Sequence, residues 1–414
     1  MSEEHNLFDY CHVNTNLDDD YFVGIKSDAN GIKVCFPIGY QLSSDEKILR
    51  KDIMNLISVL SEFNKIDKDN FNLNYYNYNK NISFPINAYI EIINQFIEKS
   101  SYYMEKEISY VKKNRGKINW PQTIKKQKPF LQSNGSLVYL NYIVRDNFNN
   151  ENNLITQIHK FCVYESFYKL GWIFTSYMPE KPKIYKDVKL FLGVLNDKFA
   201  KINNDKDKRL FMAMIDIVKY LDTERDKKTF YFGTYRFEYV WENLIDRTFG
   251  IKDKDRYFPK THWNLRTNEN KNNSALQPDT IMIYNDDIYV LDAKYYKFGI
   301  TGNIKDLPNS SSINKQITYG EYIYNNKDFR DEKEVYNAFI IPYNSHENEF
   351  NSIDYYLNIG EATAEWKIGD YMYEKVQAII LDTRYLMYHY KDNDENQMGK
   401  LSNVIKRNEE LSLN

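Results

Sequence analysis

The sequence predicts a mixed α/β protein, with an α+β domain over residues 1–150 and a helical segment plus a second domain over residues 151–414. Runs of β-branched and aromatic residues, typical of strands, alternate with segments whose apolar residues recur at helical spacing. An asparagine-rich stretch at residues 147–153 marks the boundary. Beyond it the order helix, hairpin, helix, strand indicates a small mixed sheet flanked by helices.

The composition is that of an ordinary globular protein. The 414 residues are 42% hydrophobic and 27% charged, and a chain this long can bury a large core. No apolar run reaches the roughly 18 residues of a transmembrane helix, and the acidic first residues do not resemble a secretory signal. Three widely spaced cysteines, Cys11, Cys35 and Cys162, argue against a disulfide framework or a zinc site. We therefore expect a cytoplasmic protein without membrane association.

The N-terminal domain is predicted to begin with a polar stretch, residues 1–20, that we expect to be poorly ordered. Two strand-like runs follow, and the sequence Asp28-Ala29-Asn30-Gly31 between them suits a hairpin turn. The predicted elements in this region are strands at residues 21–26 and 32–37, a helix at 43–63, a polar loop at 64–82 and a second helix at 86–104.

A basic window extends from residue 108 to residue 145. It contains no Asp or Glu, although the whole chain has a net charge of −3. Three interpretations stay open: a solvated basic face on β-hairpins, contact with the phosphate backbone of DNA, and docking to a partner protein. The candidate contact residues are Lys112, Lys113, Arg115, Lys117, Lys125, Lys126 and Lys128.

Helices are predicted between this window and the hairpin at residues 154–170 and 234–249, with a further apolar helix at residues 210–221. The first includes His159, which we expect to be structural. The second carries Glu238 and Glu242, which are four residues apart and therefore share a face. Either glutamate could complete a metal site or be solvated, and the spacing does not show which of Glu238 and Glu242 would be the metal ligand.

The hairpin at residues 277–296 is the most informative stretch. Residues 280–284 and 288–291 are strand formers, and Asn285-Asp286-Asp287 has the composition of a turn. Folding about Asp286 places Asp279 opposite roughly position 293, and therefore beside Asp292.

Side chains alternate between the two faces of a strand, so Asp292 and Lys294 share a face. Two carboxylates and one ammonium then converge at one end of an apolar hairpin. Mg²⁺ prefers one or two carboxylates together with water and phosphate oxygens, and it neutralises charge that develops on a phosphoryl group. A lysine alongside can position the attacking water. A surface turn followed by a salt-bridged strand end is the alternative interpretation.

One helix and two strands are predicted after the hairpin. The helix includes Gln316, on the side where polar groups would face the carboxylates, and Tyr319 three residues later. The strands are at residues 335–342 and 376–381.

Several of these residues resemble the motif of the PD-(D/E)XK nuclease superfamily. They are Pro278-Asp279, Asp292-Ala293-Lys294, the glutamate helix upstream and the Lys315-Gln316 helix downstream. More closely, most of the chain resembles the LlaJI family of restriction endonucleases, which are McrC-like. Residues 21–47 carry this likeness, together with residues 115–120 and 123–124.

The resemblance implies a PD-(D/E)XK core and a Mg²⁺-dependent DNA endonuclease, with Mn²⁺ able to substitute. It implies double-stranded DNA and an McrB-like AAA+ GTPase as partners, with the N-terminal half docking on the GTPase. The implied catalytic residues are Asp279, Asp292, Lys294 and Glu242; the implied metal ligands are Asp279, Asp292, Glu242 and the backbone carbonyl of Ala293; Glu238 and Gln316 are supporting residues.

Three functions follow from this pattern: the nuclease subunit of a phage-defence restriction system, a stand-alone type II restriction endonuclease, or a non-catalytic assembly subunit with a decayed nuclease fold. The complete set of Asp279, Asp292 and Lys294 argues against decay. The sequence contains no P-loop of the form G-x-x-x-x-G-K-[ST], so any GTP hydrolysis must come from another chain.

Overall fold

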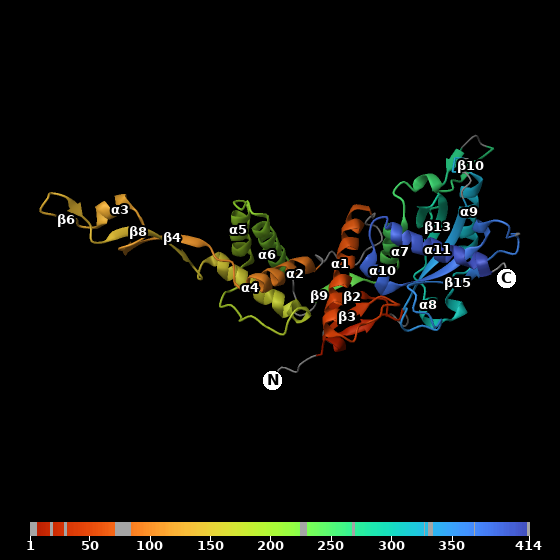
Figure 1. The fold of residues 1–414 in the computed structure, drawn as a ribbon, viewed down its shortest axis with the longest axis horizontal. Helices are drawn as coiled ribbons and strands as arrows, with labels where there is room; N and C mark the ends of the chain where they lie inside the picture. The colour runs from red at the N-terminus through yellow and green to blue at the C-terminus, as the bar shows by residue number, and fades with distance from the viewer. Residues whose placement is uncertain are drawn as a thin grey trace. The chain divides into compact units, whose positions relative to one another are not determined.

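The structure is a computed structural model, and it describes residues 6–16, 20–28, 31–70, 84–223, 230–266, 270–326, 328–329, 334–367 and 369–411. The chain divides into two compact units (Figure 1). Unit 1 combines Met1–Tyr78 with Lys228–Asn414, and unit 2 is Asn79–Lys227.

Unit 1 is built on a five-stranded mixed sheet in the order β12-β13-β14-β16-β15. β13, β14 and β16 are parallel, and the outer strands β12 and β15 are antiparallel to their neighbours. The carboxyl ends of the three parallel strands therefore lie at one edge of the sheet, which we name the carboxyl edge. The strands are β12 (Thr280–Tyr284), β13 (Asp287–Ala293), β14 (Val335–Tyr343), β15 (Tyr356–Ala362) and β16 (Val376–Asp382).

Helices cover this sheet because its strands are apolar on both faces. Every residue of β14 is buried, as in a central parallel strand. Tyr289 of β13 hydrogen-bonds Ser402 of α11 at 2.7 Å, whereas its neighbours on the opposite face pack against α9. The helices are α7 (Phe237–Phe249), α8 (Phe298–Thr301), α9 (Ser310–Asn325) and α11 (Glu395–Leu411), with short 3₁₀ turns η3 (Asp255–Tyr257), η4 (Ile304–Asp306) and η5 (Met372–Glu374) and a small ribbon of β10 (His262–Asn264) and β11 (Asn270–Asn272).

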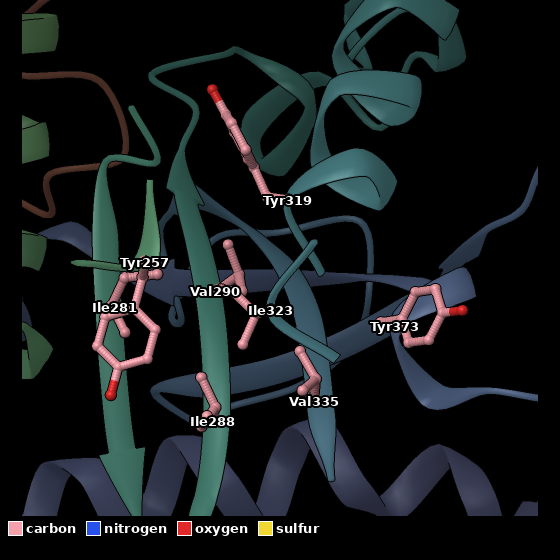
Figure 2. Packing of buried hydrophobic residues seen from close by; sticks show 8 residues of the cluster. All are labelled: Tyr257, Ile281, Ile288, Val290, Tyr319, Ile323, Val335 and Tyr373. Carbon is pink, nitrogen blue, oxygen red and sulfur yellow. The ribbon is translucent and has the colours of Figure 1, made fainter. Parts of the chain in front are cut away.

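One apolar cluster fixes α9 on the sheet. Ile288 and Val290 of β13 lie between Ile281 of β12 and Val335 of β14, and Ile323 of α9 packs over them (Figure 2). These side chains are between 0% and 2% exposed, so the face of β13 that leads to Asp292 is closed to solvent below the carboxyl edge.

A second sheet of unit 1 joins segments that are far apart in sequence. Its order is β1-β3-β2-β9, and β2 pairs with β9 from Val23↔Thr234 to Ser27↔Phe230. The elements are η1 (Leu7–Tyr10), β1 (Cys11–Val13), β2 (Val23–Asp28), β3 (Gly31–Phe36) and β9 (Phe230–Thr234), with α1 (Glu46–Asn70) and α10 (Thr383–His389) packed together nearby.

The two units differ from the expected domains at residues 1–150 and 151–414. A strand edge needs a hydrogen-bonding partner, and β9 supplies one for β2 about two hundred residues downstream. In the same unit, Asn55 of α1 donates a hydrogen bond to the carbonyl of Met387 at 3.1 Å. The asparagine-rich stretch at residues 147–153 lies inside unit 2, where residues 147–149 are the end of a strand and residues 150–153 connect it to a helix.

Unit 2 contains a group of helices and a strand ribbon. In Figure 1 the paired strands β4 and β8 lead away from the helices toward α3 and the β6–β7 hairpin. The helices are α2 (Ile86–Lys99), α4 (Leu154–Leu170), η2 (Gly171–Ile173), α5 (Val188–Phe199) and α6 (Asp205–Thr223). The ribbon comprises β4 (Lys106–Lys113), β5 (Lys117–Ile118), α3 (Trp120–Lys126), β6 (Phe130–Leu131), β7 (Leu137–Val138) and β8 (Tyr142–Asn149).

Most predicted elements are confirmed, and their ends differ. The helix expected at residues 86–104 stops at Lys99, because Ser100 adopts a left-handed conformation with φ 48°. α1 continues to Asn70, so the loop expected from residue 64 is wrong for residues 64–70; residues 71–83 lie outside the described part of the chain. The expected disorder of residues 1–20 is wrong for Leu7–Val13, because β1 pairs with the edge of β3. Residues 29–30 of the predicted first turn are not described.

Within the described residues, no helix combines the length and the apolar character needed to cross a membrane.

His159 of α4 is buried without charge in unit 2. Its side chain is 3% exposed, and its Nδ1 accepts the Tyr103 N–H at 2.8 Å. Burial, followed by the nearby charge of Lys99, lowers the pKa of His159 to about 3. This agrees with the expected structural role.

Acidification should therefore destabilise the protein through His159. The pKa of an unfolded histidine is about 6.5. Between that pH and pH 3 the unfolded chain binds a proton that the folded chain excludes, so the free energy of unfolding falls as the pH falls, by at most about 1.4 kcal/mol per pH unit. Urea unfolding of wild type and His159→Gln at several pH values between 4 and 7 measures this slope. A variant with the same slope as wild type would contradict the assignment.

Candidate active site

The register of the β12–β13 hairpin places the two aspartates together. Thr280 pairs with Leu291 and Tyr284 pairs with Asp287, which leaves a two-residue turn. Asn285 and Asp286 form this turn with φ values of 48° and 69°, as two-residue hairpin turns favour. The predicted three-residue turn is thus wrong by one residue. One more pair along the same register puts Asp279 opposite Asp292 rather than opposite residue 293.

Asp279 is fixed through both its side chain and its main chain. Its Oδ2 accepts the Ala293 N–H at 2.9 Å, which links the two strands just beyond their last regular pair. Its carbonyl oxygen accepts a hydrogen bond from Lys254 Nζ at 2.6 Å, and the same ammonium pairs with Asp246 at 2.7 Å. Sequence reasoning missed Lys254, because nothing in the local pattern around Lys254 connects it to a residue 25 positions later.

Asp292 and Lys294 share a face, as the alternation of side chains predicts. Lys294 Nζ lies 2.5 Å from Asp292 Oδ2, and Asp292 is only 6% exposed. Burial alone would lower the pKa of Lys294, but the charge of Asp292 and its hydrogen bond raise the pKa above its ordinary value. Lys294 is therefore a protonated donor at neutral pH.

The carboxyl group of Asp279 has a raised pKa. Burial is the largest cause, followed by the charge of Asp292 and a hydrogen bond between the two carboxyl groups. The raised pKa reflects the cost of a second negative charge beside Asp292, and a bound cation would offset that cost. Hard oxygen donors of this kind fit a Mg²⁺ ion, which is commonly bound through one or two carboxylates.

Glu242 of α7 is electrostatically linked to this pair. Burial, followed by the negative charge of Asp292, raises the pKa of Glu242 to about 6. The positive charge of Lys294 opposes this shift. Glu238 instead accepts a hydrogen bond from Arg236 Nε at 2.7 Å. Among the described residues, however, no three His, Cys, Asp or Glu side chains lie close enough together to hold a metal ion. The structure thus brings Asp279, Asp292 and Lys294 together and leaves Glu242 outside a three-ligand cluster.

Gln316 has a different contact from the one expected. It is 1% exposed, and its Nε2 donates to the carbonyl of Val290 at 2.6 Å. Its amide therefore holds α9 against β13 two residues before Asp292. Tyr319, three residues later, donates to the carbonyl of Gln277 at 3.2 Å, so the same helix also holds the approach to Asp279.

Lys315 is a second cation near the carboxylates that sequence reasoning did not assign to the site. Burial would lower the pKa of Lys315, but its hydrogen bond with Tyr319 and the charges of Asp292 and Asp279 raise it. The spacing of four residues between Lys315 and Tyr319, next to Gln316, was the available signal.

The seven basic candidates of the window at residues 108–145 belong to unit 2. All seven side chains are exposed, on β4, the turn after it, β5, α3 and the segment that follows α3. Lys113 pairs with Asp146 of β8 at 2.5 Å, just outside the window that lacks acidic residues.

Comparison with known proteins places the chain among the restriction endonucleases. Residues 22–365 match the family described as LlaJI restriction endonuclease. The chain belongs to the LlaJI restriction endonuclease family.

A search of the curated proteins found no match. A similar solved chain comes from a refined half-complex of the tetradecameric assembly of Thermococcus gammatolerans McrB AAA+ hexamers with bound McrC. The two chains are 15% identical, the comparison covers 93% of this chain and 83% of that one, and the TM-score is 0.40.

Removing the amide of Gln316 should loosen the helix that holds β13. Gln316→Leu introduces an apolar side chain of similar size and leaves the Val290 carbonyl without this donor, so we expect the free energy of unfolding to fall by about 1–3 kcal/mol. Urea unfolding measures the change. Asn314→Leu, on an exposed position of the same helix, is the control and should change stability little. Equal stability of Gln316→Leu and wild type would contradict this role.

Proposed function

We propose that this chain is the DNA endonuclease subunit of a phage-defence restriction system and hydrolyses phosphodiester bonds of double-stranded DNA with Mg²⁺. The observation that carries the proposal is the convergence of Asp279, Asp292 and Lys294 at the carboxyl edge. Membership of the LlaJI restriction endonuclease family supports the same conclusion. A PD-(D/E)XK core is the fold that this motif and the mixed sheet would represent.

Asp279 and Asp292, with the backbone carbonyl of Ala293, would hold the metal ion. When bound, Mg²⁺ or Mn²⁺ supplies a Lewis acid that lowers the pKa of water and neutralises negative charge on the phosphate. Lys294, protonated and held by Asp292, donates a hydrogen bond that orients the attacking water or a phosphate oxygen. Glu242, with a pKa of about 6, is ionised at neutral pH and adds negative charge that favours a cation.

The preferred partner is an McrB-like AAA+ GTPase, which would activate cleavage. The McrC-like segments at residues 21–47, 115–120 and 123–124 and the missing P-loop support this choice. The ribbon of unit 2 offers a surface for docking, because Ile124 and Leu131 are 62% and 73% exposed among lysines. A stand-alone type II enzyme and a non-catalytic assembly subunit are the alternatives.

Loss of the Asp292 carboxylate should abolish cleavage. Asp292→Asn keeps the shape of the side chain but removes the charge that pairs with Lys294, so we expect the rate of plasmid cleavage in Mg²⁺ to fall by at least about 10²-fold. Asp286→Asn is the matched control, because Asp286 is an exposed carboxylate at the tip of the same hairpin and asparagine suits its positive φ. Circular dichroism checks that both variants are folded. Cleavage at the wild-type rate by Asp292→Asn would exclude this site.

Dependence on the partner can be tested on the ribbon. We expect cleavage to need an McrB-like protein and GTP, and Ile124→Ser to reduce GTP-stimulated cleavage about tenfold by removing an apolar contact. Leu190→Ser, an exposed leucine of α5 in the same unit, is the control. Site-specific cleavage without GTP would favour the stand-alone enzyme, and no cleavage with any metal or partner would favour the assembly subunit.

A further inference from the structure

Unit 1 contains a pocket that the candidate active site does not use. Its volume is about 280 Å³. Its walls come from the N-terminal half of α1, from the segments that follow β14 and from α10 at the end of β16. The residues that carry its chemistry are Lys51, His346, Tyr355, Arg384, Tyr385 and His389.

Three aromatic rings of this pocket form a stack. Tyr385 lies in the middle, with Tyr355 at 4.1 Å and 15° on one side and His389 at 4.3 Å and 23° on the other. Tyr355 is 44% exposed, so the stack ends on a ring that a planar group can cover. Aromatic platforms of this kind bind nucleic-acid bases with little regard to sequence.

Arg384 gives the pocket a fixed cation. Its Nε and Nη2 both lie 3.0 Å from Oδ1 of Asp52, which is fully buried. Tyr40 and Tyr388 donate to the same oxygen at 3.0 and 2.7 Å. A guanidinium has five N–H donors, so this pairing orients the group and leaves donors for an anion.

The carboxylate in the pocket lining already accepts hydrogen bonds from within the protein. Asp382 accepts the main-chain N–H of Ser345 at 2.9 Å and that of Tyr385 at 2.7 Å, which offset its charge. Lys51 of α1 adds an exposed ammonium to the pocket lining. An aromatic stack beside a fixed guanidinium and a lysine matches the chemistry of a nucleotide, with its planar base and its phosphate.

The pocket lies at the same edge of the sheet as the candidate active site. Ala293 aligns with Ile340 of β14, Ile340 aligns with Ile379 of β16, and Asp382 ends β16 three residues later. Two strand spacings and three residues of rise place the backbones of Ala293 and Asp382 roughly 14 Å apart. One DNA strand advances about 3.4 Å of helix axis per nucleotide, so this separation corresponds to about four nucleotides.

We propose that this pocket binds one nucleotide of the DNA substrate a few positions from the scissile phosphate, with its phosphate at Arg384 and Lys51 and its base, turned out of the duplex, against the Tyr355 stack. This assignment rests on the proposed endonuclease function, because it places the same strand in both sites. The pocket holds the strand and takes no part in the chemical step.

Binding of a short fluorescein-labelled DNA duplex to the full-length protein, in EDTA to prevent cleavage, tests the proposal. The test variant is Lys51→Gln/Tyr355→Leu, since both side chains are exposed. Arg384 is left unchanged because its removal would leave the buried charge of Asp52 without its cationic partner. Lys201→Gln/Tyr185→Leu, an exposed pair in unit 2, is the matched control. A duplex substituted with 5-iodouracil, crosslinked by light and mapped by mass spectrometry, locates the contact.

We expect the test variant to bind the duplex about tenfold more weakly, and the control to bind like wild type. The slope of the logarithm of the affinity against the logarithm of the salt concentration should be smaller in the test variant by about one, because one phosphate contact is lost. Crosslinks should fall on Tyr355, the exposed end of the stack. Unchanged duplex affinity in the test variant, or no binding by wild type, would overturn the proposal. Binding of free dTMP that the variant loses while duplex affinity stays unchanged would also overturn it, by assigning the pocket to a free nucleotide.

Cleavage separates this inference from the proposed function. If wild type does not cut DNA in Mg²⁺ with partner and GTP but the test variant still loses duplex affinity, only the endonuclease proposal fails. If wild type cuts DNA and the test variant binds the duplex as tightly as wild type, only the pocket assignment fails.

Discussion

The hydrogen bond from the Ala293 N–H to Asp279 Oδ2 is the contact on which the arrangement of the site depends. It forms only in one register of the β12–β13 hairpin, which the two-residue turn at Asn285 and Asp286 sets. A slip of one residue would turn every side chain of β13 to the opposite face and would separate Asp292 from its present surroundings. The buried cluster below the carboxyl edge holds that register, because a slip would replace Ile288 and Val290 in it by the differently shaped side chains of the opposite face, which is also buried.

The direction of the strands explains why polar groups gather at this edge. β13, β14 and β16 run the same way, so the segments that leave them meet at one end of the sheet. β13 ends at the carboxylate and lysine pair, and β16 ends at Asp382 beside the aromatic pocket. Open α/β sheets generally bind their ligands at the carboxyl ends of the strands, where side chains from several loops converge. Two chemically different sites can therefore share one edge without sharing residues.

Pairing between β2 and β9 makes unit 1 from two distant pieces of the chain. Gly24 and Gly233 face each other across this pair, and a Cβ on Gly24 would lie 2.2 Å from the carbonyl oxygen of Phe232. Only glycine allows this close approach. Unit 2, with its basic ribbon, is consequently inserted between β3 and β9 in sequence, while the sheet that carries the candidate site is completed by the C-terminal part of the chain.

The sequence by itself determined the hairpin at residues 280–293, the shared face of Asp292 and Lys294 and most helices, because these features depend on spacing within a few residues. Family resemblance added the LlaJI assignment, which the match over residues 22–365 confirms. Only the tertiary structure decided the division into units, the anchoring role of Gln316, the support of Asp279 by Lys254 and the pocket at Arg384. Each of these joins residues from separate elements, and no local pattern records which elements will pack together once the apolar faces are buried.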